Sequence, residues 1–430
     1  MIGRRRVLAS SLALAAGAGL ARPARAQGQE TLTILANVAH QTAAQGPQGA
    51  TDNNVQAAFE RANNCRIVWR NIPWPQMRAT FLRAISASTS EYDIVMVIDD
   101  WASGETLARL LPLDEYQARA PIEAADDIAQ GMRAQFTAEG KLRAVPIRSN
   151  PQLLHYNKTI LEAARVAPPR TIEQLIAAAR AAAGRRADGA QVYGLGVKAE
   201  EDVIGMVKAF GGEVLNAGYE IFPARDKVAA ALAALQGLYQ ANAIPPNFHT
   251  MDANAVIALM RDGLLAMSIF GDSYFNRFND QRASRVAGQV VSVPIPGVAD
   301  GSVAPTKVAF WGMALAANSP PARRELSWQF MRHLASPDSQ LKMALNGNGP
   351  VRFAVAEMPQ YLTEAPYGRA SAQALRAASP QLPVFEGSAE VRDIFNEEAT
   401  QAIVGRKTID AALDAASARI RTVVAAQRPR

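Results

Sequence analysis

Apolar residues follow two alternating spacings along the first third of the chain. Continuous or alternating apolar runs predict β-strands at 31–37, 66–72 and 92–98. Apolar positions three or four residues apart predict helices at 55–62 and 77–85. A long polar loop is expected at 38–54, after the first strand. This order of strands and helices is typical of a mostly parallel sheet with both faces covered by helices.

The same alternation returns in the second half of the chain. Strands are predicted at 264–270, 290–294 and 308–316. Helices are predicted at 203–210, 228–240, 253–261, 319–335 and 409–426. The chain has 430 residues, of which 49% are apolar. A chain of this length exceeds what one hydrophobic core usually holds, so two lobes are expected.

The segment 140–184 has the most distinctive order of elements. A short strand is predicted at 142–147, then a polar break at Ser149, Asn150 and Pro151, then a second strand at 153–156. A short helix follows and stops at two prolines. Thr171 and Gln174 then have the spacing of a capping box, which predicts the start of another helix ending at Gly184.

This order resembles the crossover between the lobes of bacterial extracellular solute-binding proteins of the sugar ABC importer group (family 1, maltose-binding-protein-like). Three other pieces occur in the family's order: Asp93-Ile-Val-Met-Val-Ile-Asp-Asp-Trp, Gly263-Leu-Leu-Ala-Met-Ser-Ile and Trp328-Gln-Phe-Met-Arg-His-Leu. The resemblance implies a two-lobe α/β periplasmic-binding-protein fold, each lobe a mostly parallel sheet flanked by helices. It implies crossings near 147, 295 and 346. The N-terminal lobe would then hold 27–147 and 296–346, and the C-terminal lobe 148–295 and 347–430.

The resemblance also implies a function. A small carbohydrate or polyol would bind between the lobes, which close by hinge motion and then dock on a membrane ABC permease. No cofactor is implied, and a monomer is expected. The aromatic content is only 7%, which favours a small sugar or polyol over a long oligosaccharide. A polyamine or other small cation is the nearest alternative, and the sequence does not name the ligand.

The first 26 residues have the features of an export signal. Arg4-Arg5-Arg6 precedes an apolar run, and Ala24-Arg25-Ala26 is a cleavage site of the small-x-small type, so the mature chain should begin at Gln27. The arginines resemble a twin-arginine signal, and an ordinary Sec signal is the alternative. Both predict the periplasm. Cleavage removes five arginines and no acid, which lowers the net charge from +6 to +1 and argues against nucleic-acid binding.

Catalytic and metal-binding signatures are missing from the sequence. The four histidines lack metal-ligand spacing, and there is no nucleophile elbow or phosphate-binding loop. The single cysteine, Cys65, has no partner for an intramolecular disulfide and is expected to be a small buried residue. Asp99 and Asp100 are adjacent, so their side chains should point to opposite faces of a strand. An exported carbohydrate-active enzyme is therefore the weaker alternative to a binding protein.

Ligand contacts are expected where strands end, because open parallel sheets form a crevice there. Polar groups would bind hydroxyls, and an aromatic ring would cover an apolar sugar face. The candidates are His40, Asp100, Trp101, Asn150, His249, Asp272, Tyr274, Trp311, Gly312 and Arg352. Arg352 is included because it matches the family's Gly-Pro-x-Arg loop. Each polar candidate could instead be a cap, turn, hinge or ion-pair residue. Trp101 and Trp311 could be core residues, and Trp74 fits either role.

Overall fold

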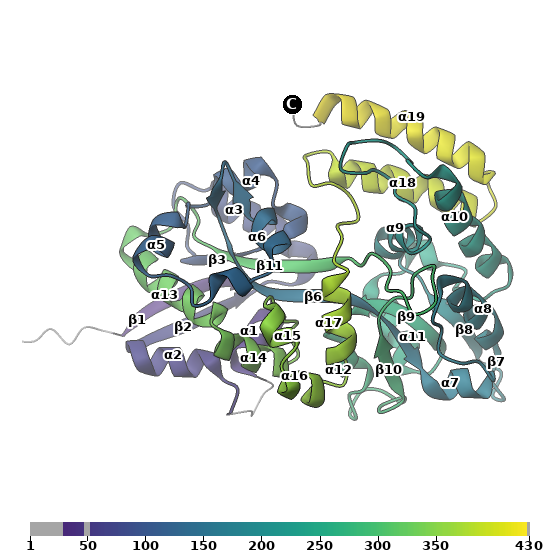
Figure 1. Ribbon diagram of the computed structural model, residues 1–430, viewed down its shortest axis with the longest axis horizontal. Coiled ribbons are helices and arrows are strands. Elements are labelled where there is room, and N and C mark those ends of the chain that lie inside the picture. The colour runs from purple at the N-terminus through teal and green to yellow at the C-terminus, as the bar shows by residue number, and fades with distance from the viewer. Residues whose placement is uncertain (1–28, 47–51, 428–430) are drawn as a thin grey trace, which may run out of the picture.

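The computed structural model describes residues 29–46 and 52–427. The predicted signal peptide, 1–26, lies outside the described residues. The polypeptide forms two lobes placed side by side, joined by strands that run from one to the other (Figure 1). Among the residues that are described, no helix is both long and apolar enough to cross a membrane.

The first lobe contains the N-terminal strands and the helices around them. Its elements before the crossing are β1 (Glu30–Ala36), α1 (Val38–Gln45), α2 (Val55–Asn63), β2 (Cys65–Asn71), α3 (Trp74–Ser86), β3 (Ile94–Ile98), α4 (Gly104–Ala108), α5 (Asp114–Arg119), α6 (Gln130–Gln135), β4 (Thr137–Ala138) and β5 (Lys141–Leu142). Those that return to it are β11 (Val308–Ala314), α13 (Arg324–Ala335) and α14 (Pro337–Leu345).

The second lobe is built mainly from the middle and the end of the chain. Its elements are α7 (Lys158–Ala163), α8 (Ile172–Ala182), β7 (Gly184–Arg185), β8 (Gln191–Gly196), α9 (Ala199–Ala209), α10 (Arg225–Gln240), α11 (Ala253–Arg261), β9 (Leu265–Gly271), α12 (Tyr274–Phe278), β10 (Val290–Val293), α18 (Ser388–Ile403) and α19 (Ile409–Gln427). Three short helices follow α14: α15 (Phe353–Ala356) and α16 (Pro359–Glu364) lie below the crossing in Figure 1, and α17 (Gly368–Arg376) passes in front of it.

A single strand, β6 (Val145–Asn157), connects the sheets of the two lobes. Its first half pairs with β11 and its second half with β9, so the strand order β2-β1-β3-β11-β6-β9-β8-β7 runs through both lobes. Pairing is parallel at β2-β1-β3 and at β8-β9, and antiparallel around β11 and β6. The predicted break at Ser149–Pro151 is wrong: the backbone stays extended there because Ser149 pairs with Gly349, and Pro151 accepts a hydrogen bond from the Asp272 amide.

Beside two smaller hydrophobic clusters, two large ones account for most of the two lobes among the described residues. One draws on residues up to Ile147 and then from Val308 to Leu375. The other draws on Leu154 to Ala304 and on Leu382 to Val424. The predicted two-lobe α/β architecture is therefore confirmed. The lobe limits near 147, 295 and 346 stay a prediction, and the clusters favour connections at 147–154, 304–308 and 375–382.

The expectation of a polar loop at 38–54 is wrong in its first part. Residues Val38–Gln45 form helix α1, and the Asn37 side chain caps it by accepting a hydrogen bond from the Ala39 amide. The buried face of this helix consists of His40, Ala43 and Ala44. Small alanines give little hydrophobic signal in the sequence, which is why the helix was not predicted. The helix buries His40 in the first lobe.

Candidate functional site

Four aromatic rings gather where β3, β11 and the starts of α1 and α3 meet. Trp101 follows β3 and stacks on Trp74, with ring centroids 5.6 Å apart and planes 19° apart. Trp311 on β11 meets both rings nearly edge-on, at 5.7 Å from each. The His40 ring lies 4.4 Å from Trp311. Trp311 is 4% exposed and Trp101 is 9% exposed, whereas Trp74 is 54% exposed. Trp74 therefore offers the accessible face of this aromatic cluster.

Arg148, which was not predicted as a site residue, lies beside these rings. It is directly opposite Trp311 in the pairing of β6 with β11, so the two side chains share one face of the sheet. Arg148 is 6% exposed, and burial lowers the pKa of its guanidinium. Its positive charge helps to lower the pKa of His40 in the first lobe, and it opposes the rise in the pKa of Asp272 in the second. This side chain therefore links the aromatic cluster to the end of β9.

Asp272 follows β9 and is fully buried. Its Oδ2 accepts a hydrogen bond from Ser371 Oγ at 2.6 Å, and no described residue partners its Oδ1. Burial raises the pKa of this carboxyl to about 7, against the opposing effects of Ser371 and Arg148. The sequence placed Asp272 at the end of a strand, but not in such a dry environment.

Asn150 lies close to Asp272 along the crossing. Its Oδ1 accepts a hydrogen bond from Ser273 Oγ at 3.1 Å. The side chain also lies against Gly271: a Cβ at that position would be 2.2 Å from Asn150 Oδ1, so a larger residue there would displace the Asn150 amide. Tyr274 begins α12, and its ring packs on Phe270 with centroids 4.8 Å apart. These contacts bring Asn150, Asp272 and Tyr274 together at one end of the second-lobe sheet.

A charged group lies next to the aromatic cluster. Lys307 Nζ is 3.1 Å from Asp100 Oδ2, and the Phe310 amide donates to Asp99 Oδ1 at 3.0 Å. Burial alone would raise the pKa of Asp100, but Lys307 and then Arg392 lower it below its usual value. Burial and the neighbouring Asp100 charge raise the pKa of Asp99. Because Arg392 belongs to α18 of the second lobe, the charge of Asp100 in the first lobe is stabilised from across the crossing.

Three candidates lie apart from these groups. Arg352 is fully buried and donates to the carbonyls of Ala335, Ala124 and Glu123, so its donors are occupied. Gly312 faces the first-lobe core, where a Cβ would be 2.9 Å from the Ala144 Cβ. His249 is exposed and lies in a short 3₁₀ turn against Phe248. Arg352 therefore anchors the loops around it, Gly312 allows close packing in the core, and His249 lies on the surface.

Comparison with known proteins identifies the family. The model described as bacterial extracellular solute-binding protein matches residues 54–366. The chain belongs to the bacterial extracellular solute-binding proteins. A binding protein of Brucella abortus (strain 2308) is 24% identical over 412 residues, covering 94% of this chain and 96% of the relative. The match is to a family of binding proteins rather than to an enzyme family.

Solved structures show the same fold as this solute-binding protein. Maltose-bound MalE3 of T. maritima superposes with a TM-score of 0.77 at 20% identity, covering 91% of this chain and 99% of the other. A solute-binding protein of Agrobacterium radiobacter K84 in complex with ribitol gives a TM-score of 0.73 at 20% identity, covering 91% and 98%. The predicted resemblance and the two-lobe periplasmic-binding-protein fold are thus confirmed.

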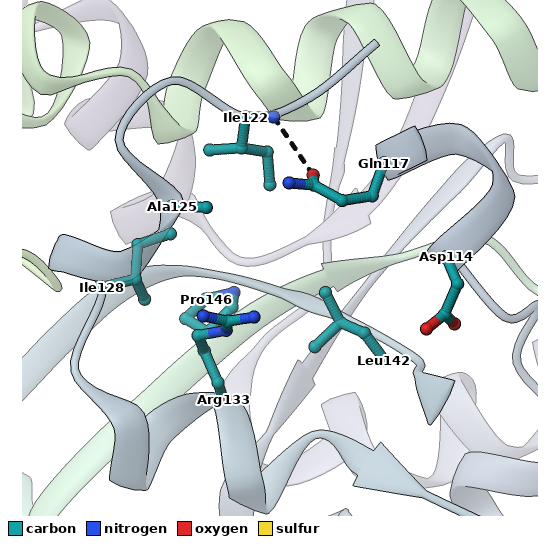
Figure 2. Close-up of a pocket in the computed structure, with 8 residues that line it drawn as sticks. All are labelled: Asp114, Gln117, Ile122, Ala125, Ile128, Arg133, Leu142 and Pro146. Atoms are coloured by element: carbon teal, nitrogen blue, oxygen red, sulfur yellow. Dashed lines mark hydrogen bonds between the residues drawn. The ribbon is translucent and has the colours of Figure 1, made fainter. Parts of the chain in front are cut away.

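A small cavity inside the first lobe of this solute-binding protein is separate from the groups above. It has a volume of about 80 Å³ and is lined mainly by apolar side chains (Figure 2). The polar residues around it are Asp114, Gln117 and Arg133, and Gln117 Oε1 accepts a hydrogen bond from the Ile122 amide at 3.1 Å. None of the predicted ligand contacts lines this cavity, so it does not compete with the region between the lobes.

Within the described residues, 29–46 and 52–427, no group of three or more His, Cys, Asp or Glu side chains could hold a metal ion. Cys65 is a buried free thiol. The groups at the crossing offer hydrogen bonding and ring stacking.

Proposed function

We propose that this solute-binding protein binds a small carbohydrate or polyol between its lobes and delivers it to a membrane ABC permease. The observation that carries the proposal is that groups from both lobes border β6: Trp311 of the aromatic cluster lies opposite Arg148, and the Asp272 amide donates to the Pro151 carbonyl. The first lobe supplies the accessible ring of Trp74 on Trp101, and the second supplies the carboxylate of Asp272. A ring and a charged acceptor suit the apolar face and the hydroxyl rim of a sugar. Structural neighbours crystallised with maltose and ribitol support this ligand class.

The lobes would close on the ligand by bending the three connections. We propose that these lie at 147–154, 304–308 and 375–382, between the two hydrophobic clusters. Ser149 on β6 holds the loop before α15 by pairing with Gly349 and by donating from its hydroxyl to the Pro350 carbonyl at 2.8 Å. Extended connections of this kind change their dihedral angles without unpacking either core. We further propose that the protein acts as a monomer in the periplasm and has no enzymatic activity.

Ligand binding is expected to stabilise and compact the protein. A ligand at a hundred times its dissociation constant adds about 2.7 kcal/mol of stability. A thermal-shift screen of ribitol, mannitol, maltose and spermidine measures this, and X-ray scattering at saturation should show a smaller radius of gyration. Stabilisation by spermidine alone would replace the sugar hypothesis with the polyamine hypothesis, and an unchanged scattering curve would contradict hinge closure.

Asp272 is expected to accept hydrogen bonds from ligand hydroxyls. Hydrogen bonds to a charged group contribute about 1.5–3 kcal/mol, so Asp272→Ala should weaken binding at least about tenfold. Asp272→Asn should recover part of the loss for a neutral polyol because its amide oxygen still accepts. For a polyamine the charge itself matters, so Asn should be nearly as harmful as Ala. Calorimetry on both variants decides between these ligands, and unchanged affinity in both would remove Asp272 from the site.

A further inference from the structure

Arg148 is a largely buried side chain with no partner in the described part of the chain that would explain its burial by folding alone. Among the residues in the described ranges, no hydrogen bond or ion pair to its side chain is seen, and its Nε is buried without a partner. Other buried cations have partners for their charge, although Arg143 Nε, like Arg148 Nε, is buried without one in these ranges. Lys198 lies 2.8 Å from Asp202, and Arg143 donates to the Leu110 carbonyl at 2.9 Å. Burying the Nε of a guanidinium without a partner lowers the stability of the folded state, so its presence indicates a use outside folding.

The groups facing Arg148 are also short of partners. Both ring nitrogens of His40 and Oδ1 of Asp272 are buried and unpartnered within the part of the chain that is described. Three further groups shift the pKa of Arg148: it is raised by Tyr274 and Tyr367 and lowered by Arg277. Arg148 and Asp272 attract each other without forming an ion pair. Donors and acceptors therefore converge from both lobes on one point of β6.

We propose that Arg148 and Asp272 together bind a vicinal diol of the ligand, Arg148 donating to one hydroxyl oxygen and Asp272 accepting from the neighbouring hydroxyl. This rests on the proposed function and specifies its ligand chemistry. Each hydroxyl both donates and accepts, so two adjacent hydroxyls satisfy a guanidinium and a carboxylate at once. A carboxylate ligand would be repelled by Asp272, and an ammonium ligand by Arg148. The pair thus selects neutral polyhydroxy compounds.

The test compares Arg148→Met with Arg143→Met, a second buried arginine of the same region. Methionine replaces a charged side chain with an apolar one of similar length. In the ligand-free protein at pH 6, Arg148→Met should raise the melting temperature because it removes an unpaired buried charge. Arg143→Met should lower it, since that arginine donates to the Leu110 carbonyl. Arg148→Lys keeps the charge without the planar fork and is the fallback if the methionine variant does not fold.

Affinity is measured by calorimetry with whichever of ribitol, mannitol and maltose binds the wild type most tightly, and with its monodeoxy analogues. Arg148→Met and Arg148→Lys should weaken binding at least tenfold, and Arg143→Met should leave it unchanged. Removing the hydroxyl that Arg148 contacts should weaken binding to the wild type. The same removal should cause no further loss of affinity in Arg148→Met, which lacks the donor. Equal affinity of wild type and Arg148→Met would overturn the pairing and leave the proposed function intact. If none of the three probes binds the wild type, the proposed function falls and the inference with it.

Discussion

Trp311→Ala is expected to destabilise the protein by about 3–5 kcal/mol, as large aromatic truncations in a core do. Trp311 is 4% exposed, and its ring contacts Trp74, Trp101 and His40. Trp101→Ala should have a similar effect, because that ring also packs on Phe81 at 5.7 Å. Removal of either ring would leave a cavity in the first lobe. The measurement is urea denaturation of the ligand-free variants.

Trp74→Ala should behave in the opposite way. More than half of this side chain is exposed, so its loss should change stability little, while a sugar that stacks on it should bind more weakly by about 0.5–1.5 kcal/mol. Phe353→Ala is the matched control, because Phe353 is another exposed large apolar residue, 37% exposed, on α15. Weaker binding in Trp311→Phe at unchanged stability, with no effect of Trp74→Ala, would show that the buried ring is the ligand contact.

The order of strands and the two-lobe plan could be predicted from the sequence because apolar periodicity records them. The strand expected at 264–270 is β9 (Leu265–Gly271), and the one expected at 308–316 is β11 (Val308–Ala314). The predicted helix start at Thr171 is also confirmed, because Thr171 Oγ1 accepts a hydrogen bond from the Gln174 amide at 3.2 Å. Local chemistry predicted this cap correctly, but it misplaced the break at Ser149–Pro151 and missed helix α1, because the extended or helical state of these segments depends on tertiary contacts.

The partners of each site residue could not be predicted, because they come from distant segments. Arg352 donates to carbonyls more than 200 residues away in the chain, at Ala124 and Glu123, and a sequence motif does not show that its donors are occupied. Arg148 was missed because it lies inside an apolar strand pattern, where a charge is usually taken as the solvent-facing position. Trp74, next to two prolines, gave no periodic signal that separates a core ring from an exposed one.

The stability of the ligand-free protein is expected to depend on the ionisation of Asp272. Its pKa is about 7 in the folded protein, against roughly 3.9 for an unfolded chain. Because the folded pKa is the higher one, the stabilising contribution is complete below about pH 4 and is lost as the pH rises through 7. At about 1.36 kcal/mol per pKa unit, the loss is on the order of 2–4 kcal/mol by pH 8.

Asp272→Asn keeps the shape of the side chain and removes this ionisation. The variant should therefore be more stable than the wild type at pH 8 by up to about 4 kcal/mol, and the difference should shrink toward zero at pH 4. Urea denaturation at several pH values measures the difference between the two proteins, which cancels the contributions of other buried acids such as Asp202. Asp252→Asn is the control, since Asp252 is an exposed helix N-cap at which asparagine caps equally well. A constant difference between wild type and Asp272→Asn from pH 4 to pH 8 would mean that folding does not raise the pKa of Asp272, and that the Arg148 charge compensates its burial.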